Sequence, residues 1–476
     1  MIAQDPQIDQ QVQIRTAFDR LRQGAQAMAL TTAAGRIERL KRLKTWIETN
    51  KATLYKAMHD DFRKPSAEVD LGEMVGLMSE LRYMIKHLKT WMRPQLVPTP
   101  LSMVGTSGYL KYEPKGVVLI IAPWNYPFDL LIGPLATAIA AGNVCMLKPS
   151  ELTPHTSAVM KQMIAELFSP DEVVLFEGDA DTAQVMLELP FNHIFFTGSP
   201  ALGKVVMTAA AKHLASVTLE LGGKSPFVVD ETANIVKAAE ILAWSKYFNN
   251  GQTCIAPDYL LVHESVKIPL INEVKNAVDR MYGENAAARA ASDSYARIVN
   301  PRHFQRVKGL IEDAVAKGAT VTMGGRVNAD DNYVEPTMID GVTDDMRLMQ
   351  EEIFGPLLPV VSVKNLDEAL RHINSREKPL ALYLHSRKQK NIDYVMDRTS
   401  SGNTVVNDAL IHFTHAELPF GGVNNSGIGS YHGYFGFQEL SHRRGVLRRD
   451  FGTMKFLFPP YTNRVKTIMG WLVKYF

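Results

Sequence analysis

Short apolar runs alternate with helical patterns along most of the chain after residue 115. Each run is rich in Val, Ile and Leu, and the stretches between runs have the pattern of helices, expected at 129–141, 153–167, 181–188 and 200–213. Buried strands separated by helices predict a mostly parallel sheet that is covered on both faces. The runs of this first series are VVLII (117–121), NVCML (143–147), EVVLF (172–176), HIFFT (193–197) and VTLEL (217–221).

A second series of the same kind begins near residue 225 and predicts a second lobe. Its runs are PFVVD, YLLVH, ATVTMGG, LLPVVSV, LALYLHS and NTVVN. A chain of 476 residues also exceeds the size at which one hydrophobic core keeps growing. We therefore expect an α/β fold with two Rossmann-like lobes, each built on an open parallel sheet.

The chain outside these two series has a different pattern. The first 90 or so residues are amphipathic and predict helices, as in GRIERLKRLKTWIETNKATLYKAMHDDF. Residues 93–114 are rich in Pro, Gly and Ser between β-like runs, which predicts an exposed hairpin arm. Because unpaired strand edges favour pairing with another sheet, we expect this arm and the run RRGVLRR (443–449) to mediate oligomerisation.

One stretch has the length of a membrane span. Residues 130–147 carry no charge over 18 positions. They include Pro134 and a Gly142-Asn143 turn signal, so a buried helix, a turn and a buried strand fit better. The tail VKTIMGWLVKYF is too short to span, and the first residues lack the apolar segment of a signal peptide. No membrane span is expected.

Charge and cysteine content exclude further classes of protein. The 52 basic and 50 acidic side chains leave a net charge of +2, which argues against nucleic-acid binding by phosphate neutralisation. The chain has two cysteines in no CxxC pattern and 13 histidines in no HExxH pattern, so no metal site is expected. Low cysteine usage without a signal peptide indicates a reducing, cytoplasmic setting.

The two cysteines occupy contrasting positions. Cys145 lies inside the apolar run NVCML, where a free cysteine is a small buried hydrophobe. Cys254 lies in FNNGQTCIAP (248–257), whose polar, Gly-containing flank suits a tight turn. A thiol in such a turn is accessible to a substrate as a nucleophile. On this evidence alone, a nucleophile and a buried thiol remain equally open for Cys254.

Two further polar residues follow strands, at the edge of a parallel sheet where ligands gather. Glu220 ends the run VTLEL before two glycines, and burial would raise its pKa toward that of a general base. Asn125 lies in the rigid loop APWNYPF (122–128), where its amide could donate hydrogen bonds to an oxyanion. The alternatives are a solvent-facing carboxylate for Glu220 and a turn-forming role for Asn125.

A fourth motif, FFTGSPALGK (195–204), places small residues before a helix N-terminus. Such a turn can meet a pyrophosphate, although it is not GxGxxG and is a weak signal by spacing alone. Taken together, the motifs resemble those of the NAD(P)-dependent aldehyde dehydrogenase superfamily. They occur in the family's order over about residues 20–450: PWNYPF, KPSE (148–151), FTGSPALG (196–203), LELGGKSP (219–226), GQTCIAP (251–257), EEIFGPLLPV (351–360) and LPFGGVNNSGIG (418–429).

The resemblance implies roles for three residues. Cys254 would be the nucleophile, Glu220 the general base, and Asn125 an oxyanion donor beside the backbone N–H of Cys254. It also implies cofactor contacts: Lys148 and Glu151 at the adenine ribose, Ser199 at the pyrophosphate, Glu352 at the nicotinamide ribose, and Phe354 beside the nicotinamide. Without the other motifs, Lys148 and Glu151 would be interpreted as a solvated pair. The full expected cofactor set is Trp124, Lys148, Glu151, Gly198, Ser199, Gly203, Leu221, Glu352 and Phe354.

The resemblance also implies a cofactor preference, an oligomer and a substrate class. Glu151 would accept hydrogen bonds from ribose hydroxyls and repel a 2′-phosphate, so NAD is expected to be preferred and NADP usable. The segments at 251–262, 411–423 and 429–444 resemble the class 3 and coniferyl-aldehyde branch. That branch implies a homodimer and medium- or long-chain aliphatic or aromatic aldehydes. His412 and His415 are expected to pack or to line the substrate funnel.

Two alternatives to a hydrolytic dehydrogenase remain, a CoA-acylating relative and a protein that kept the fold without the chemistry. The presence of Glu220 argues against the first alternative and the three catalytic residues together argue against the second.

The same resemblance implies how the chain is divided. The expected parts are an NAD(P)-binding domain (1–92 and 115–222), a catalytic domain (223–425), oligomerisation or bridging elements (93–114 and 426–452) and a C-terminal tail (453–476).

Overall fold

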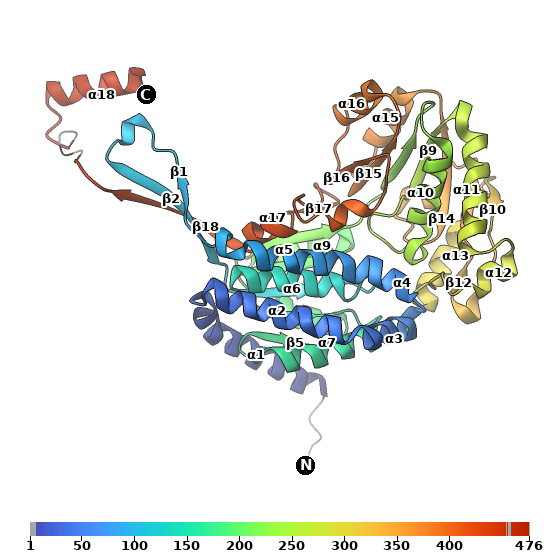
Figure 1. Cartoon of the computed structure of the whole chain (residues 1–476), viewed down its shortest axis with the longest axis horizontal. Coiled ribbons are helices and arrows are strands. Elements are labelled where there is room, and N and C mark those ends of the chain that lie inside the picture. The colour runs from blue at the N-terminus through green and yellow to red at the C-terminus, as the bar shows by residue number, and fades with distance from the viewer. Residues whose placement is uncertain (1–5, 454, 456–457, 476) are drawn as a thin grey trace, which may run out of the picture.

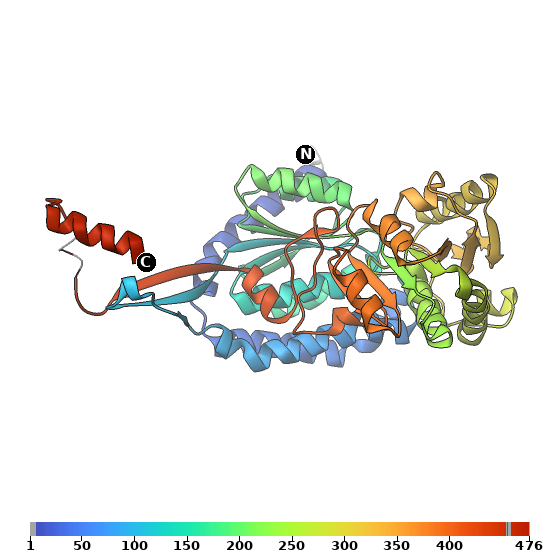
Figure 2. The ribbon, with the colours of Figure 1, turned by 90° about the horizontal axis from the view of Figure 1, so that it is seen from above.

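A computed structural model describes residues 6–453, 455 and 458–475 of the chain. Two sheets covered by helices form the body of the molecule, and a slender arm projects from one end (Figures 1 and 2). Residues 1–5 of the expected NAD(P)-binding domain and residues 454, 456, 457 and 476 of the expected tail lie outside the described residues.

The N-terminal part is helical, as its amphipathic pattern predicts. The side chains of Leu40, Leu43 and Ile47 lie on one face of α2 and are fully buried, while Thr32 caps the helix by accepting from the N–H of Gly35. The elements are α1 (Pro6–Ala29), α2 (Ala33–Thr49), α3 (Lys51–Phe62), α4 (Ser66–Val69), the π-helix η1 (Asp70–Val75) and α5 (Gly76–Trp91).

The first sheet has six strands in the order β17-β7-β6-β3-β4-β5. Its strands are parallel except β17, which pairs antiparallel with β7. The strands are β3 (Val117–Ile121), β4 (Val144–Lys148), β5 (Val173–Leu175), β6 (His193–Gly198), β7 (Ser216–Leu221) and β17 (Gly427–Ile428). The helices between them are α6 (Asp129–Ala141), α7 (Pro154–Leu167), α8 (Ala180–Leu187) and α9 (Pro200–Ala211).

The uncharged stretch at 130–147 belongs to this lobe. Residues 131–141 of α6 are all buried, and Gly142 ends the helix at φ 91° before the buried strand β4. The expected helix, turn and strand are therefore confirmed. Within the described part of the chain, we find no helix with the length and apolar character needed to cross a membrane.

The second sheet has seven strands in the order β10-β13-β14-β9-β8-β15-β16, all parallel except β10, which is antiparallel to β13. The strands are β8 (Pro226–Val229), β9 (Tyr259–His263), β10 (Thr320–Met323), β13 (Thr337–Asp340), β14 (Leu357–Val363), β15 (Ala381–His385) and β16 (Asn403–Val406). The helices of this part are α10 (Ile235–Tyr247), α11 (Lys267–Tyr282), α12 (Ala286–Ala291), α13 (Pro301–Ala316), α14 (Arg347–Gln350), α15 (Leu366–Asn374) and α16 (Gln389–Met396).

Short elements connect these parts. They are β11 (Val327–Asn328), which pairs with β12 (Tyr333–Val334), and the 3₁₀ turns η2 (Leu101–Met103), η3 (Phe248–Gly251), η4 (Glu264–Val266), η5 (Ala329–Asp331) and η6 (Ile411–Thr414). The two Rossmann-like sheets expected from the sequence are confirmed. Strands β13 and β17 were not predicted, and both add a pairing that the apolar runs do not reveal.

The arm is a three-stranded antiparallel sheet in the order β1-β2-β18. Strands β1 (Gln95–Val97) and β2 (Thr106–Pro114) form the predicted hairpin, and β18 (Ser441–Arg449) pairs with β2 along its whole length. Helix α17 (Gly433–Glu439) precedes β18, and α18 (Asn463–Tyr475) lies at the far end of the arm (Figure 1). Strands β1 and β18 are the two edges of this sheet, and Leu96 of β1 is 81% exposed.

Candidate active site

A deep pocket lies where the loops of the first sheet meet the segment that leads into β9. Its empty volume is about 600 Å³, and most of its lining is aromatic or aliphatic. Cys254 and Glu220 both line it, so the fold brings the expected nucleophile and the expected base into one cavity. The lining residues are Gly72, Tyr126, Asp129, Leu130, Thr197, Glu220, Phe248, Thr253, Cys254, Ile255, Leu410, Phe413, Phe420, Tyr431 and His432.

Cys254 follows a turn with an unusual backbone. Asn249, Asn250 and Gly251 all adopt positive φ, at 52°, 57° and 70°. Asn tolerates this region better than most residues, and a Cβ on Gly251 would lie 2.3 Å from the carbonyl oxygen of Gly355. The Asn-Asn-Gly sequence is therefore what this turn requires, and it presents the half-buried Cys254 side chain to the pocket.

The Cys254 thiol is held in its neutral form. Burial, with smaller contributions from the carboxyl groups of Glu352 and Glu220, raises its pKa to about 12. The backbone N–H groups of Cys254 and Ile255 oppose this by hydrogen-bonding the sulfur. A thiolate therefore forms only when the proton has an acceptor or when positive charge comes close. By contrast, Cys145 is fully buried in β4, as its apolar run predicts.

Glu220 lies near the end of β7, where it pairs with Thr197 of β6 on one side and Gly427 of β17 on the other. Its side chain is buried, and neither carboxyl oxygen has a hydrogen-bond partner among the described residues. Burial, with a smaller effect of Glu439, raises the pKa of Glu220 well above its usual value. The solvent-facing alternative is thus wrong. A buried, unpartnered carboxyl group facing a pocket is costly and is typical of functional sites.

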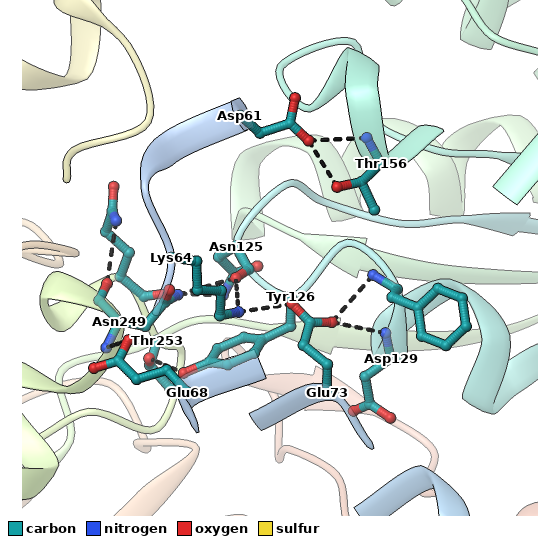
Figure 3. A network of polar contacts seen from close by, with 12 residues as sticks. Asp61, Lys64, Glu68, Glu73, Asn125, Tyr126, Asp129, Thr156, Asn249 and Thr253 are labelled. Carbon is teal, nitrogen blue, oxygen red and sulfur yellow. Dashed lines mark hydrogen bonds and ion pairs between the residues drawn. The ribbon is translucent and has the colours of Figure 1, made fainter. Parts of the chain in front are cut away.

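Asn125 is buried behind the lining, in the loop that follows β3. Its side-chain Nδ2 donates to the carbonyl oxygen of Gln252 at 3.0 Å, two residues before Cys254. An amide carries two hydrogens, so one remains for another acceptor. The loop is also joined to the cysteine turn by Tyr126 and Thr253, whose hydroxyl oxygens lie 2.6 Å apart (Figure 3).

Trp124 contacts Phe354, and Glu352, two residues before Phe354, is close enough to Cys254 to raise its pKa. The rings of Trp124 and Phe354 meet edge to face at 5.4 Å, and Phe354 holds a left-handed φ of 45°. Burial raises the pKa of Glu352 to about 8, while the N–H of Gly223 donates to its carboxylate. A Cβ on Gly222 would lie 2.1 Å from a carboxyl oxygen of Glu352, so the glycine allows this close approach.

The remaining expected cofactor residues lie at strand ends of the first sheet. Ser199 caps α9 by accepting from the N–H of Leu202, and a Cβ on Gly203 would press on Leu221 at 2.8 Å. A Cβ on Gly198 would lie 2.5 Å from the Phe196 ring. Pro200 has no N–H and that of Leu202 is capped by Ser199, so what this turn offers a pyrophosphate is small residues and the positive end of the helix dipole.

Lys148 and Glu151 lie at the end of β4. Lys148 is buried and donates to the carbonyl oxygen of Pro149 at 3.0 Å, while burial lowers its pKa. Its Nζ lies 3.5 Å from Oε2 of Glu151, whose side chain is 48% exposed. The alternative of a fully solvated pair is wrong for Lys148. The open carboxylate of Glu151 fits a hydrogen-bond acceptor for ribose hydroxyls.

The lining also contains an acidic and a basic side chain that no sequence motif singled out, Asp129 and His432. Burial lowers the pKa of His432 to about 3, and its ring stacks on Phe420 at 5.2 Å. Asp129 directly follows the PWNYPF loop, a position that could have marked it, whereas nothing near His432 in the sequence points to the pocket. Of the two histidines expected to pack or line the funnel, His412 stacks on Phe420 at 5.7 Å and His415 is exposed.

Comparison with known proteins agrees with this geometry. The model of the aldehyde dehydrogenase family matches residues 1–446. The chain is 44% identical over 441 residues to the putative aldehyde dehydrogenase AldX of Bacillus subtilis, covering 92% of this chain and 99% of that protein. It is 40% identical over 461 residues to aldehyde dehydrogenase family 3 member A2 of Mus musculus, covering 96% and 94%.

Solved structures extend the similarity to the fold. The substrate-bound state of Staphylococcus aureus AldH matches with a TM-score of 0.91 and 40% identity, covering 96% of this chain and 99% of that one. A betaine aldehyde dehydrogenase of Staphylococcus aureus in complex with NAD+ matches at 0.83 and 26%, covering 94% and 91%. An NADP dependent enzyme of E. coli matches at 0.84 and 26%, covering 92% and 90%.

Proposed function

The chain belongs to the aldehyde dehydrogenase family, and on this premise we propose how its residues oxidise an aldehyde to the carboxylic acid with a nicotinamide dinucleotide. The observation that carries the proposal is the presence of Cys254 and of the unpartnered carboxyl group of Glu220 in one apolar pocket. A nucleophile and a base in one cavity are what acyl chemistry followed by hydrolysis requires.

Cys254 first loses its thiol proton to solvent and then attacks the aldehyde carbon as the thiolate. The carbonyl oxygen becomes an oxyanion, which accepts hydrogen bonds from the backbone N–H of Cys254 and the free amide hydrogen of Asn125. A nicotinamide dinucleotide held by residues such as Ser199 and Glu352 would supply the acceptor for the hydride of the tetrahedral carbon. Cys254 then carries a thioester. Glu220 takes a proton from a water molecule, the resulting hydroxide adds to the thioester carbon, and the thiolate leaves as the acid forms.

The residues present fit a nicotinamide dinucleotide. The first turn of α9 with Ser199 suits the pyrophosphate, because its small residues leave room and the helix dipole favours an anion. Glu352 is placed between Gly222 and Cys254, where its carboxylate would hold ribose hydroxyls of the nicotinamide half. Trp124, Gly198, Gly203, Leu221 and Phe354 would shape the groove around it.

We propose that NAD is preferred and that NADP is also used. The exposed carboxylate of Glu151 would accept hydrogen bonds from the adenine ribose and would repel a 2′-phosphate. Lys148 Nζ lies 3.5 Å from that carboxylate and would weaken the repulsion without abolishing it.

The pocket supports a medium- or long-chain aliphatic or an aromatic aldehyde as substrate. Leu130, Phe248, Ile255, Leu410 and Phe413 give its wall a hydrocarbon character, and apolar surface buried there contributes roughly 25 cal/mol per Å² to binding. A relative from Staphylococcus aureus that is 42% identical is a 4,4'-diaponeurosporen-aldehyde dehydrogenase.

For the assembly we propose a homodimer formed through the arm. Strand β1 leaves one edge of the arm sheet unpaired, and Leu96 and Leu447 are 81% and 60% exposed. Exposed edges and apolar side chains on a projecting sheet favour a second copy of the chain as partner.

The domain limits proposed from the sequence are kept, with β17 linking the 426–452 element to the first sheet. A cytoplasmic location is proposed because both cysteines are free.

One kinetic comparison tests the proposed function. NADH formation from an aliphatic aldehyde would be followed with and without added CoA. The proposal expects turnover without CoA and release of the free acid. Turnover that required CoA would show that Glu220 does not serve hydrolysis and would favour acyl transfer to a thiol.

A further inference from the structure

A fully buried ion pair lies behind the Asn125 loop. Lys64, which follows α3, and Glu73 of η1 are both 0% exposed, and Lys64 Nζ donates to Oε1 of Glu73 at 2.6 Å. Removing two charges from water is costly, and an apolar pair of the same volume is often no less stabilising. The pair therefore calls for an explanation other than stability.

Both members of the pair hold the same short segment, residues 125–129. Lys64 Nζ also donates to the carbonyl oxygen of Asn125 at 3.2 Å and lies 4.0 Å from the centre of the Tyr126 ring. The other oxygen of Glu73, Oε2, accepts from the N–H groups of Phe128 at 3.1 Å and Asp129 at 2.9 Å. Figure 3 shows Lys64 at one end of the segment, beside Asn125, and Glu73 at the other end, beside Asp129.

A second carboxylate from the same N-terminal region holds the cysteine turn. Oε2 of Glu68 accepts from the N–H of Asn249 at 3.0 Å. The side chain of Asn249 in turn donates to the carbonyl oxygens of Asn125 at 2.9 Å and Gln252 at 3.1 Å. The carbonyl of Asn125 thus accepts from both Lys64 and Asn249, so the two loops share a common anchor.

We propose that Lys64 and Glu73 are positioning residues for the oxyanion donor. By fixing both ends of segment 125–129, they keep one amide hydrogen of Asn125 on Gln252 and leave the other directed at the oxyanion. This rests on the proposed role of Asn125. The pair makes no contact with substrate, and it acts through the loop.

The chemistry of the pair suits this task. A lysine has three donors in a compact head and a glutamate has two acceptor oxygens, so the pair satisfies one carbonyl and two N–H groups at once. The two N–H groups belong to the start of α6, where unpaired donors and the helix dipole favour a carboxylate. An apolar pair could fill the same space but would leave the two N–H groups without partners and the carbonyl of Asn125 with Asn249 alone.

The test compares Glu73→Gln, Lys64→Met and the combined variant with a matched control. The control is Arg289→Met/Glu335→Gln, which removes another low-exposure ion pair (2.9 Å, 12% and 2% exposed) that contributes no residue to the pocket. Pre-steady-state NADH formation gives the hydride-transfer rate, with the NAD dissociation constant and the thermal unfolding midpoint measured alongside. A displaced donor of this kind costs about 10²-fold in rate.

We expect the Lys64 and Glu73 variants to slow hydride transfer by that factor with unchanged NAD affinity, while the control variant keeps the wild-type rate. If a single variant does not fold because a lone charge is buried, the combined variant removes both charges and keeps the test. A wild-type hydride-transfer rate in the combined variant would overturn the proposal.

Combination with Asn125→Ala shows whether the pair acts through Asn125. Asn125→Ala alone is expected to slow hydride transfer by ~10²–10³-fold. Adding Lys64→Met/Glu73→Gln should cause little further loss, because residues that act as a unit are not additive. Fully multiplicative losses would contradict the positioning role and leave the role of Asn125 intact. A wild-type rate in Asn125→Ala would instead overturn the oxyanion assignment, and the positioning role with it.

Discussion

Tyr126 and Thr253 join the two loops of the active site by a hydrogen bond of 2.6 Å between their hydroxyl oxygens. Tyr126 directly follows Asn125, and Thr253 directly precedes Cys254. The bond therefore connects the loop that carries the proposed oxyanion donor to the turn that carries the proposed nucleophile. Because the bond joins the neighbours of both reacting residues, we expect its loss to lower the catalytic rate.

Tyr126→Phe removes this bond and keeps the ring that lies under Lys64. A buried polar group left without its partner costs roughly 1–3 kcal/mol. We expect hydride transfer to slow by about 10-fold, with little change in the NAD dissociation constant. Stopped-flow NADH formation measures the rate. An unchanged rate would show that the two loops hold their geometry without the bond.

The activity should rise with pH from neutral to alkaline values. The pKa of the Cys254 thiol is raised to about 12, so its thiolate is the minor form near pH 7 and increases as the pH rises. Burial raises the pKa of Glu220 as well, so its ionised form also increases with pH. The pH profile of kcat/KM for the aldehyde measures this. A profile that falls above pH 7 while the protein stays folded would contradict it.

The same carboxyl group gives a prediction for stability. Because the folded-state pKa of Glu220 lies above its unfolded value, folding takes up a proton there, and this contribution is lost as pH rises through the folded pKa. Glu220→Gln should therefore be more stable than the wild type at pH 9 and gain less at pH 5. Thermal unfolding at both values measures the difference, and an equal gain at both would contradict the raised pKa.

The sequence predicted the strands well wherever a run was apolar and fully buried. Strands β3, β4 and β15 are examples, because burial on both faces leaves a continuous hydrophobic signal. Strand β17 has only two residues, and its pairing with β7 depends on tertiary contact. The antiparallel pairing of β10 likewise has no local signal.

The residues of the candidate site could likewise be predicted only in part from the sequence. Cys254, Glu220 and Asn125 could be singled out because each follows or ends a strand next to turn residues. Lys64 and Glu73 could not, since charged residues in an amphipathic helical region are interpreted as a solvated face. Lys64 contacts Asn125, 61 positions further along the sequence, and Glu73 contacts Phe128, 55 positions further along. These contacts exist only in the folded chain.

The choice of cofactor depends on Glu151. Its carboxylate is open to solvent and lies near Lys148 at the end of β4. Glu151→Gln removes the repulsion of a 2′-phosphate, so the ratio of kcat/KM for NADP to that for NAD should rise, by about 10-fold if one like-charge contact is lost. Steady-state kinetics with both nucleotides measures the ratio. An unchanged ratio would show that Glu151 does not face the ribose.

The lining of the pocket makes a prediction for the substrate. Asp129 faces the cavity, and its carboxyl group makes no hydrogen bond to the described residues. Asp129→Leu makes that wall apolar, so kcat/KM for a long-chain aliphatic aldehyde should rise severalfold, in line with ~0.8 kcal/mol for each buried CH2. Acetaldehyde provides the control, since it is too short to gain from the wall. A loss for both aldehydes would instead assign Asp129 to the chemistry.

The central claim is that the acyl group is carried by Cys254 and released by Glu220. The most direct measurement is mass spectrometry of Glu220→Gln quenched after mixing with NAD and hexanal, with Cys254→Ala/Glu220→Gln as the control. The account predicts a burst of NADH and a hexanoyl group on the peptide that contains Cys254, absent from the control. NADH formation without an acyl group on Cys254, or an acyl group that persists in the control, would contradict it.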